Sequence, residues 1–339
     1  MGRDRMRGGI ATAIGSLPHV DAVEAAQLVL AALPDLPCAP QLPGRSPHEG
    51  MLAAWLRALP EIEVDAEANL RLHTPDAESS GPRAVIDAHF SDDAHGGLLT
   101  FLDVAAQREE RPRAVKLQVT GPLTLGLALH DLGMGSNRAF GRAAQCSAAW
   151  ARALLQLVHE RLPDTEVVLF FDEPGLVAWT GDNAPPLDEE VASDLLSATL
   201  ANVDCIVGVH VCGAGALDIA LGAGPDVVGV EAKPWVVGHA VALARLLDRG
   251  GLLAWGAVPT DRPIGEQGTP LWKALIDLWC ELTRRGCDPV KLRTQAWVTP
   301  ACGLARHGAS QAEHALRLSG ELAERVHGQA VATRLGVGA

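Results

Sequence analysis

Four side chains of the kinds that hold zinc occur in three separate segments of the chain. His210 and Cys212 are two residues apart in the run "IVGVHVCGAG", Glu231 ends the run "DVVGVE", and Cys302 follows the run "WVTP". An imidazole, two thiolates and a carboxylate match the ligand types and the coordination number of zinc. Ligands from distant segments, one of them a carboxylate, suit a catalytic metal that exchanges a ligand for substrate. The alternative is a hydrogen-bonded core histidine beside a buried cysteine.

Further polar candidates follow other apolar runs. Asp172 and Glu173 precede Pro174 in "VVLFFDEP". A carboxylate at this position could bind a substrate ammonium, or it could cap a helix. Gly15 and Ser16 end the run "ATAIGS", where backbone N–H groups could bind an anion or simply form a turn. The chain has neither a phosphate-loop signature nor a Gly-x-Ser-x-Gly nucleophile elbow.

The elements that position these residues are predicted from eight short apolar runs, most of which precede a longer helical stretch. The runs are Ala11–Ile14, Cys38–Leu42, Ala114–Val119, Glu166–Phe171, Cys205–Val211, Asp226–Val230, Leu252–Trp255 and Leu292–Val298. Strands that alternate with helices indicate a parallel α/β architecture. Eight strands in roughly 300 residues favour a closed (β/α)8 TIM barrel, with a doubly wound open sheet as the alternative.

A barrel would bring the candidate ligands to one face. Barrel enzymes carry their catalytic groups at the carboxyl ends of the strands. His210, Cys212, Glu231 and Cys302 fall at the predicted ends of strands five, six and eight. The alternation is interrupted at about residues 61–93, where we expect a hairpin inserted between the second and third barrel strands. We expect one domain over residues 1–339.

The composition excludes several classes of partner. The chain has 28 Lys and Arg against 41 Asp and Glu, a formal net charge of −13, and no basic stripe for a phosphate backbone. Its seven scattered cysteines argue against a disulfide framework. No stretch approaches the roughly 20 apolar residues of a membrane span, and the first apolar run is too short for a signal peptide. We therefore expect a cytoplasmic protein that binds neither nucleic acid nor membrane.

In their order along the chain, these segments resemble the cobalamin-independent methionine synthase family, part of a superfamily that includes uroporphyrinogen decarboxylase. The similar segments are "AIGSLPH", "KLQVTGPLTL", "FFDEP", "HVC", "VGVE" and "TPACGL", and they span nearly the whole chain. The resemblance implies a (β/α)8 barrel in which Zn2+ activates homocysteine for methylation to methionine. It also implies that the zinc ligands are His210, Cys212, Glu231 and Cys302.

The same resemblance implies a site for the amino acid. Gly15 and Ser16 correspond to the strand end that holds the substrate carboxylate in that family. Asp172 corresponds to the catalytic aspartate that binds the substrate ammonium. Glu49, in "QLPGRSPHEGM", is a loose counterpart of a substrate-binding glutamate.

The chain also departs from the family pattern. It resembles only the C-terminal, catalytic barrel of the two-barrel enzyme, as a single-barrel form. Ala128 stands where the family has a pterin-stacking tryptophan, and Asp261 where it has a general-acid histidine. These departures favour methylcobalamin or a corrinoid protein over 5-methyltetrahydrofolate as the methyl donor. The alternatives are a related enzyme that methylates another thiol such as coenzyme M, a uroporphyrinogen decarboxylase-like enzyme, and a non-catalytic barrel.

Overall fold

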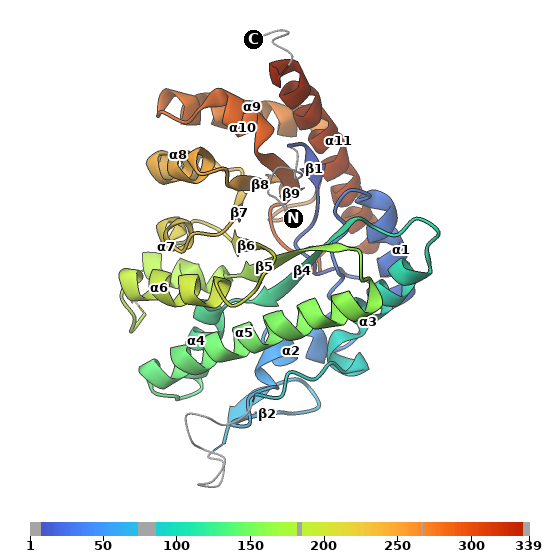
Figure 1. Ribbon diagram of the computed structural model, residues 1–339, viewed down its shortest axis with the longest axis vertical. Helices are drawn as coiled ribbons and strands as arrows, with labels where there is room; N and C mark the ends of the chain where they lie inside the picture. The colour runs from blue at the N-terminus through green and yellow to red at the C-terminus, as the bar shows by residue number, and fades with distance from the viewer. Residues whose placement is uncertain (1–7, 74–85, 182–184, 266, 335–339) are drawn as a thin grey trace.

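A computed structural model describes residues 8–73, 86–181, 185–265 and 267–334 of the chain. At its centre lies a curled sheet of seven strands, with the helices arranged around it (Figure 1). The strands are β1 (Ile10–Ala11), β4 (Ala114–Thr120), β5 (Glu166–Asp172), β6 (Ile206–Val211), β7 (Val227–Glu231), β8 (Leu252–Val258) and β9 (Ala296–Pro300). All neighbours pair in parallel, in the order β1-β9-β8-β7-β6-β5-β4. This order lacks the reversal of a doubly wound sheet, so that alternative is not supported.

Helices separate most of the strands along the chain. The α-helices are α1 (Ala22–Ala32), α2 (Ala53–Leu56), α3 (Asp92–Gln107), α4 (Pro122–Asp131), α5 (Ser136–Arg161), α6 (Glu189–Leu200), α7 (Leu217–Gly222), α8 (Ala240–Asp248), α9 (Gly268–Arg284), α10 (Pro289–Thr294) and α11 (Ala309–Arg334). Three 3-10 helices are η2 (Pro47–Glu49), η3 (Pro174–Thr180) and η4 (Pro234–His239). Among the described residues, no helix has both the length and the apolar character needed to cross a bilayer.

The second predicted strand, Cys38–Leu42, is not a strand in the structure, but it occupies the place of one. It begins with a parallel bridge to Lys116 of β4 and ends near a parallel bridge from Gln41 to Ser16, just after β1. Pro40 lies between the two bridges and has no N–H to donate, which explains why the pairing is interrupted. Together with this segment, the curled sheet is consistent with a TIM-like barrel.

The last predicted strand begins too early. The structure places the first part of Leu292–Val298 in α10, and β9 starts only at Ala296. The reason is a strong helix start that the apolar run conceals. The Asp288 side chain accepts hydrogen bonds from the N–H groups of Val290 and Lys291, and a proline follows it at the first helical position.

A hairpin is present within the segment predicted as an insertion. Its strands β2 (Ile62–Val64) and β3 (Leu70–Leu72) pair antiparallel, with Ile62 opposite Leu72. Residues 74–85 of the predicted segment lie outside the described residues. That the segment is an insertion between two barrel strands therefore stays a prediction.

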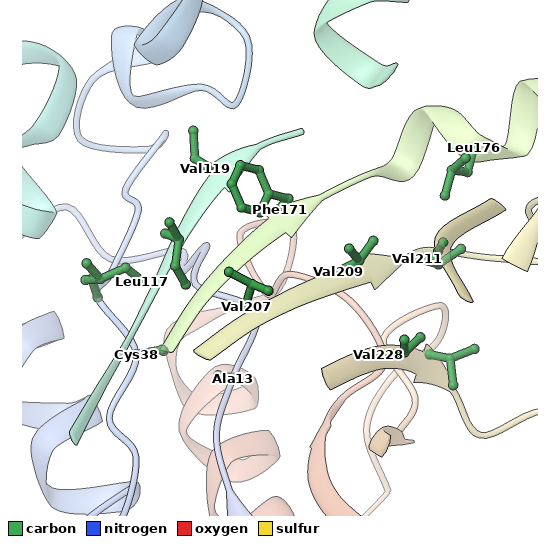
Figure 2. Packing of buried hydrophobic residues seen from close by; sticks show 14 of the residues in the cluster. Ala13, Cys38, Leu117, Val119, Phe171, Leu176, Val207, Val209, Val211 and Val228 are labelled. Carbon is green, nitrogen blue, oxygen red and sulfur yellow. The ribbon is translucent and has the colours of Figure 1, made fainter. Parts of the chain in front are cut away.

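The strands are buried on both faces, and alternate residues belong to different clusters. Leu169 and Phe171 of β5 pack in the large cluster between the sheet and the helices. Figure 2 shows part of this cluster, including Phe171. Val168 and Phe170 of the same strand belong to a smaller cluster that also contains Trp297 of β9. Successive side chains of a strand point to opposite faces, so this smaller cluster fills the inside of the curled sheet.

The end of β5 is fixed to the start of α4 by Glu173. This side chain is fully buried, and its carboxylate accepts hydrogen bonds from Leu123 N at 2.8 Å, Thr124 N at 2.7 Å and Thr124 Oγ1 at 2.6 Å. It thus caps a helix whose own N-cap residue, Gly121, has no side chain to do so. A Cβ atom at Gly121 would overlap the Glu173 carboxylate, so a glycine is required there. Burial raises the pKa of Glu173 to about 7, and the hydrogen bonds act in the opposite direction.

We expect Glu173→Gln to lower the free energy of unfolding by about 2–3 kcal/mol, because the new NH2 group would face N–H and O–H donors and leave buried groups unpaired. Urea unfolding followed by circular dichroism measures this loss. The matched control is Glu190→Gln, an exposed glutamate in the first turn of α6, which should change the free energy by less than about 0.5 kcal/mol. Equal unfolding midpoints for the two variants would contradict the capping role.

Candidate metal centre

Three potential metal ligands meet at the carboxyl end of the sheet. His210 lies near the end of β6, Cys212 directly follows β6, and Cys302 follows β9. Their ligand atoms all lie within 4.8 Å of one another. His210 Nε2 is 3.0 Å from Cys212 Sγ, which is 2.9 Å from Cys302 Sγ. Atoms that share one zinc at roughly 2.0–2.3 Å lie somewhat further apart than this, so small side-chain movements would admit the ion. The donor set therefore fits zinc.

The two cysteines act as one protonation unit. The hydrogen bond between the two thiols lowers the pKa of Cys302 and raises the pKa of Cys212. His210 also favours the Cys302 thiolate. The other ring nitrogen of His210, Nδ1, is buried and has no hydrogen-bond partner in the described part of the chain. It faces Gly229 of β7, where a Cβ atom would come to 3.1 Å from it.

Glu231, the fourth predicted ligand, is not part of this group. It ends β7, and its carboxylate lies 3.2 Å from the ammonium of Lys233. Lys233 also forms an ion pair with Asp261 at 3.1 Å. Glu231 is nevertheless close enough for its negative charge to contribute to the raised pKa of Cys212. The structure thus shows Glu231 beside the three ligands and paired with a lysine.

Asp172 borders the same cavity as the candidate ligands. The cavity has a volume of about 460 Å³, and its wall includes Ser16, Asp172, His210, Cys212 and Cys302. Asp172 Oδ1 is buried and has no hydrogen-bond partner among the described residues. Burial raises the pKa of Asp172, whereas the buried Lys116 ammonium opposes this shift. A carboxylate oxygen that is buried and unpaired at a cavity wall is suited to a cationic ligand.

The two carboxylates of the Asp-Glu-Pro segment therefore have different tasks. Helix capping was one of the two roles expected for this pair, and Glu173 caps α4. Asp172 Oδ1, by contrast, accepts no hydrogen bond from a helix among the described residues. The difference follows from strand alternation. Asp172 continues the inner face on which Phe170 lies, and Glu173 turns outward to the helix layer.

Gly15 and Ser16 follow β1 in the chain and lie close to the loop that follows β9. Gly15 has a φ of +137°, and a Cβ atom there would overlap the Gln118 side chain, so glycine is required. Ser16 accepts a hydrogen bond from Leu304 N through its backbone oxygen. A Cβ atom at Gly303 would overlap its hydroxyl oxygen, so this hydroxyl lies against the loop that carries Cys302.

Glu49 also borders the cavity, but other groups already occupy its carboxylate. It accepts hydrogen bonds from Leu42 N at 2.9 Å, Arg45 Nη1 at 2.9 Å and Gly97 N at 3.3 Å. Its side chain is almost completely buried. In this arrangement Glu49 joins the loop after Cys38–Leu42 to α3, which is a structural task.

Sequence reasoning missed two basic residues of the cavity wall. Arg306 and His307 both line it, and His307 Nε2 lies 3.1 Å from the backbone oxygen of Thr260. Their nearness in sequence to Cys302 was the available signal. They lie on an irregular loop between β9 and α11, where no periodic pattern indicates which way a side chain points.

A known protein family matches the region that contains these residues. The family described as "Cobalamin-independent synthase, Catalytic domain" matches residues 100–325. The matched region contains Asp172, His210, Cys212, Glu231 and Cys302. No curated protein is significantly similar to the chain. Because the match covers well over half of the chain, the protein belongs to the family of cobalamin-independent synthase catalytic domains.

Proposed function

We propose that this protein is a zinc-dependent methyltransferase that transfers a methyl group to the thiol of homocysteine and so forms methionine. One observation carries the proposal: a single cavity is lined by the His210, Cys212 and Cys302 group and by the buried, unpaired carboxylate oxygen of Asp172. The first suits a metal that binds sulfur, and the second suits an ammonium. Homocysteine carries both a thiol and an ammonium. The proposal treats residues 1–339 as one single-barrel domain.

Each part of the site has a chemical task. His210, Cys212 and Cys302 would hold the zinc, with Glu231 as the fourth ligand in the absence of a thiol. Bound zinc would lower the pKa of a substrate thiol well below its free value of about 8.5. Asp172 binds the substrate ammonium, and the Gly15–Ser16 strand end binds the carboxylate. Holding both ends of the amino acid orients the sulfur toward the methyl carbon.

The transfer itself needs little from the protein beyond orientation. The substrate sulfur forms a bond to the methyl carbon as the bond between methyl and donor breaks, and the electron pair of that bond leaves with the donor. A folate nitrogen needs a proton to leave, whereas cobalt does not. Asp261, in place of the family's acid, is exposed, and its hydrogen bond with Lys233 lowers its pKa. It is therefore ionised at neutral pH, which supports methylcobalamin or a corrinoid protein as donor.

The other candidate functions have less support. Coenzyme M has no ammonium, so Asp172 would have no partner there. Decarboxylation of a porphyrinogen uses no zinc and would need several arginines for its carboxylates, whereas the cavity wall has Arg306 as its single arginine among the described residues. A non-catalytic barrel would bind metal without turnover, which the assays below distinguish.

We expect the parent protein to bind about one zinc ion per chain, and Cys302→Ser to lose most of it, because the substitution removes a thiolate ligand. Metal analysis after dialysis against a weak chelator measures this. The matched control is Cys280→Ser, an exposed cysteine on α9, which should retain the metal. The same zinc content in both variants would remove Cys302 from the site.

We expect Asp172→Asn to weaken homocysteine binding by about tenfold to a hundredfold. The variant keeps the shape but loses a charge-assisted contact worth about 1.5–3 kcal/mol. Isothermal titration with homocysteine measures the Kd, and zinc content should not change. 4-Mercaptobutanoate, which lacks the amino group, is the control ligand and should bind parent and variant equally. Undiminished homocysteine binding by the variant would argue against an α-amino acid as acceptor.

We expect methylcobalamin to be a better methyl donor than 5-methyltetrahydrofolate, since Ala128 stands where the family has a stacking tryptophan and Asp261 where it has an acid histidine. Methionine formation is measured for the zinc-loaded protein with each donor at equal concentration. Heat-inactivated protein gives the background rate. Turnover that is faster with the folate, in its monoglutamate or polyglutamate form, would contradict the assignment of the donor.

A further inference from the structure

A lysine connects the candidate fourth ligand with the residue that replaces the family's acid. The Lys233 ammonium lies 3.2 Å from Glu231 and 3.1 Å from Asp261. The Lys233 N–H donates to the backbone oxygen of Glu231 at 2.8 Å, and this tight turn folds the lysine back toward the end of β7. Among the described residues, Lys233 is the only cation within ion-pair distance of Glu231.

The three side chains differ in how far they are exposed to solvent. Glu231 is only 12% exposed, whereas Lys233 is 41% and Asp261 54% exposed. A largely buried carboxylate needs either a cation or several donors. Lys233 provides the cation for Glu231. Asp261, which follows the cavity-lining Thr260 in the chain, provides a second anion that holds the lysine in this place.

The need for such a cation arises from ligand exchange. If Glu231 is the fourth ligand, as proposed, a substrate thiolate would replace it as one anion replaces another, and the released Glu231 carboxylate would have to be stabilised nearby. Without Lys233 the released carboxylate would be largely desolvated and within electrostatic reach of Cys212, so it would compete with the substrate for the metal. Lys233, in ion-pair contact with both Glu231 and Asp261, provides a cation of the kind that a released Glu231 would require.

We propose that Lys233, tethered by Asp261, is a positioning residue that draws Glu231 away from the metal and so eases the exchange of this ligand for the substrate thiol. The inference rests on the proposed function. It assigns a task to the ion pairs that this chain forms at Lys233, which the binding of metal and amino acid does not by itself require.

The test uses the full-length protein loaded with Co2+, whose absorption reports on thiolate ligands and on coordination number. The variants are Lys233→Met and the conservative Lys233→Arg. The matched control is Lys273→Met, which removes a lysine–aspartate ion pair on α9. Two quantities are measured for each: Co2+ affinity by competition with a chelator, and the Kd for homocysteine from the change in absorption.

We expect Lys233→Met to bind Co2+ about tenfold more tightly and homocysteine about tenfold more weakly, because Glu231 then stays on the metal. For Lys233→Arg both affinities should lie within about threefold of the parent values. For the control Lys273→Met both affinities should equal those of the parent. A merely structural lysine would not move the two affinities in opposite directions.

A double-mutant cycle identifies the residue through which Lys233 acts. In a Glu231→Gln background, Lys233→Met should no longer change the Kd for homocysteine, because the competing carboxylate is gone. An undiminished effect in that background would overturn the inference, as would a Lys233→Met variant that matches the parent in both affinities. In these two cases the proposed function stands. If the parent itself bound neither Co2+ nor homocysteine, the proposed function would fail, and the inference with it.

Discussion

The parallel pairing of the curled sheet determines where every functional group lies. Because all strands run in the same direction, their carboxyl ends meet on one rim, and the register places Asp172 of β5 directly beside His210 of β6. Because the strands are pleated, every second side chain points to the inside of the sheet. Below the rim, the inner positions carry apolar side chains such as Phe170 and Trp297. At the rim they carry the groups that could bind a metal and an ammonium.

Small residues on the inner face make room for these groups. A Cβ atom at Gly208 would lie 2.7 Å from the ring of Phe170, and one at Gly229 would approach the His210 ring. The buried Lys116, which lies over Phe170 and donates to the backbone oxygen of Ile14, provides positive charge in the same space. The site therefore depends on several positions that contact no substrate and no metal. Substitutions there would alter the site without removing a functional group.

Much of the architecture could be predicted from the sequence, because buried parallel strands read as continuous apolar runs and because alternation puts His210 and Cys212 on one side. The family assignment is confirmed by the match over residues 100–325. The misplaced boundaries have local causes that hydrophobic patterns do not show: a proline within Cys38–Leu42 and the Asp288 cap before β9. Such details depend on which backbone N–H groups can pair.

The roles of individual carboxylates were harder to predict, because they depend on partners far away in sequence. Glu173 caps a helix that begins about fifty residues earlier, and Glu49 is held in part by Gly97. Glu231 differs in that its partner Lys233 is only two residues away, but the segment "VEAKP" does not reveal that the two side chains pair. Side-chain pairing of this kind is visible only once the fold is known.

The position of Cys302 has a consequence for how the protein would acquire the proposed metal. Cys212 and Cys302 are 90 residues apart, and the loop that carries Cys302 lies against Ser16, next to the very first strand. A chain still being synthesised thus has only part of the ligand set until its last strand has joined its first. Loading of the proposed metal would consequently be a late event in biogenesis, after the first and last strands of the chain have paired. An ion bound as proposed would join the end of β6 to the loop after β9 and oppose their separation, so metal supply and resistance to unfolding would become linked quantities.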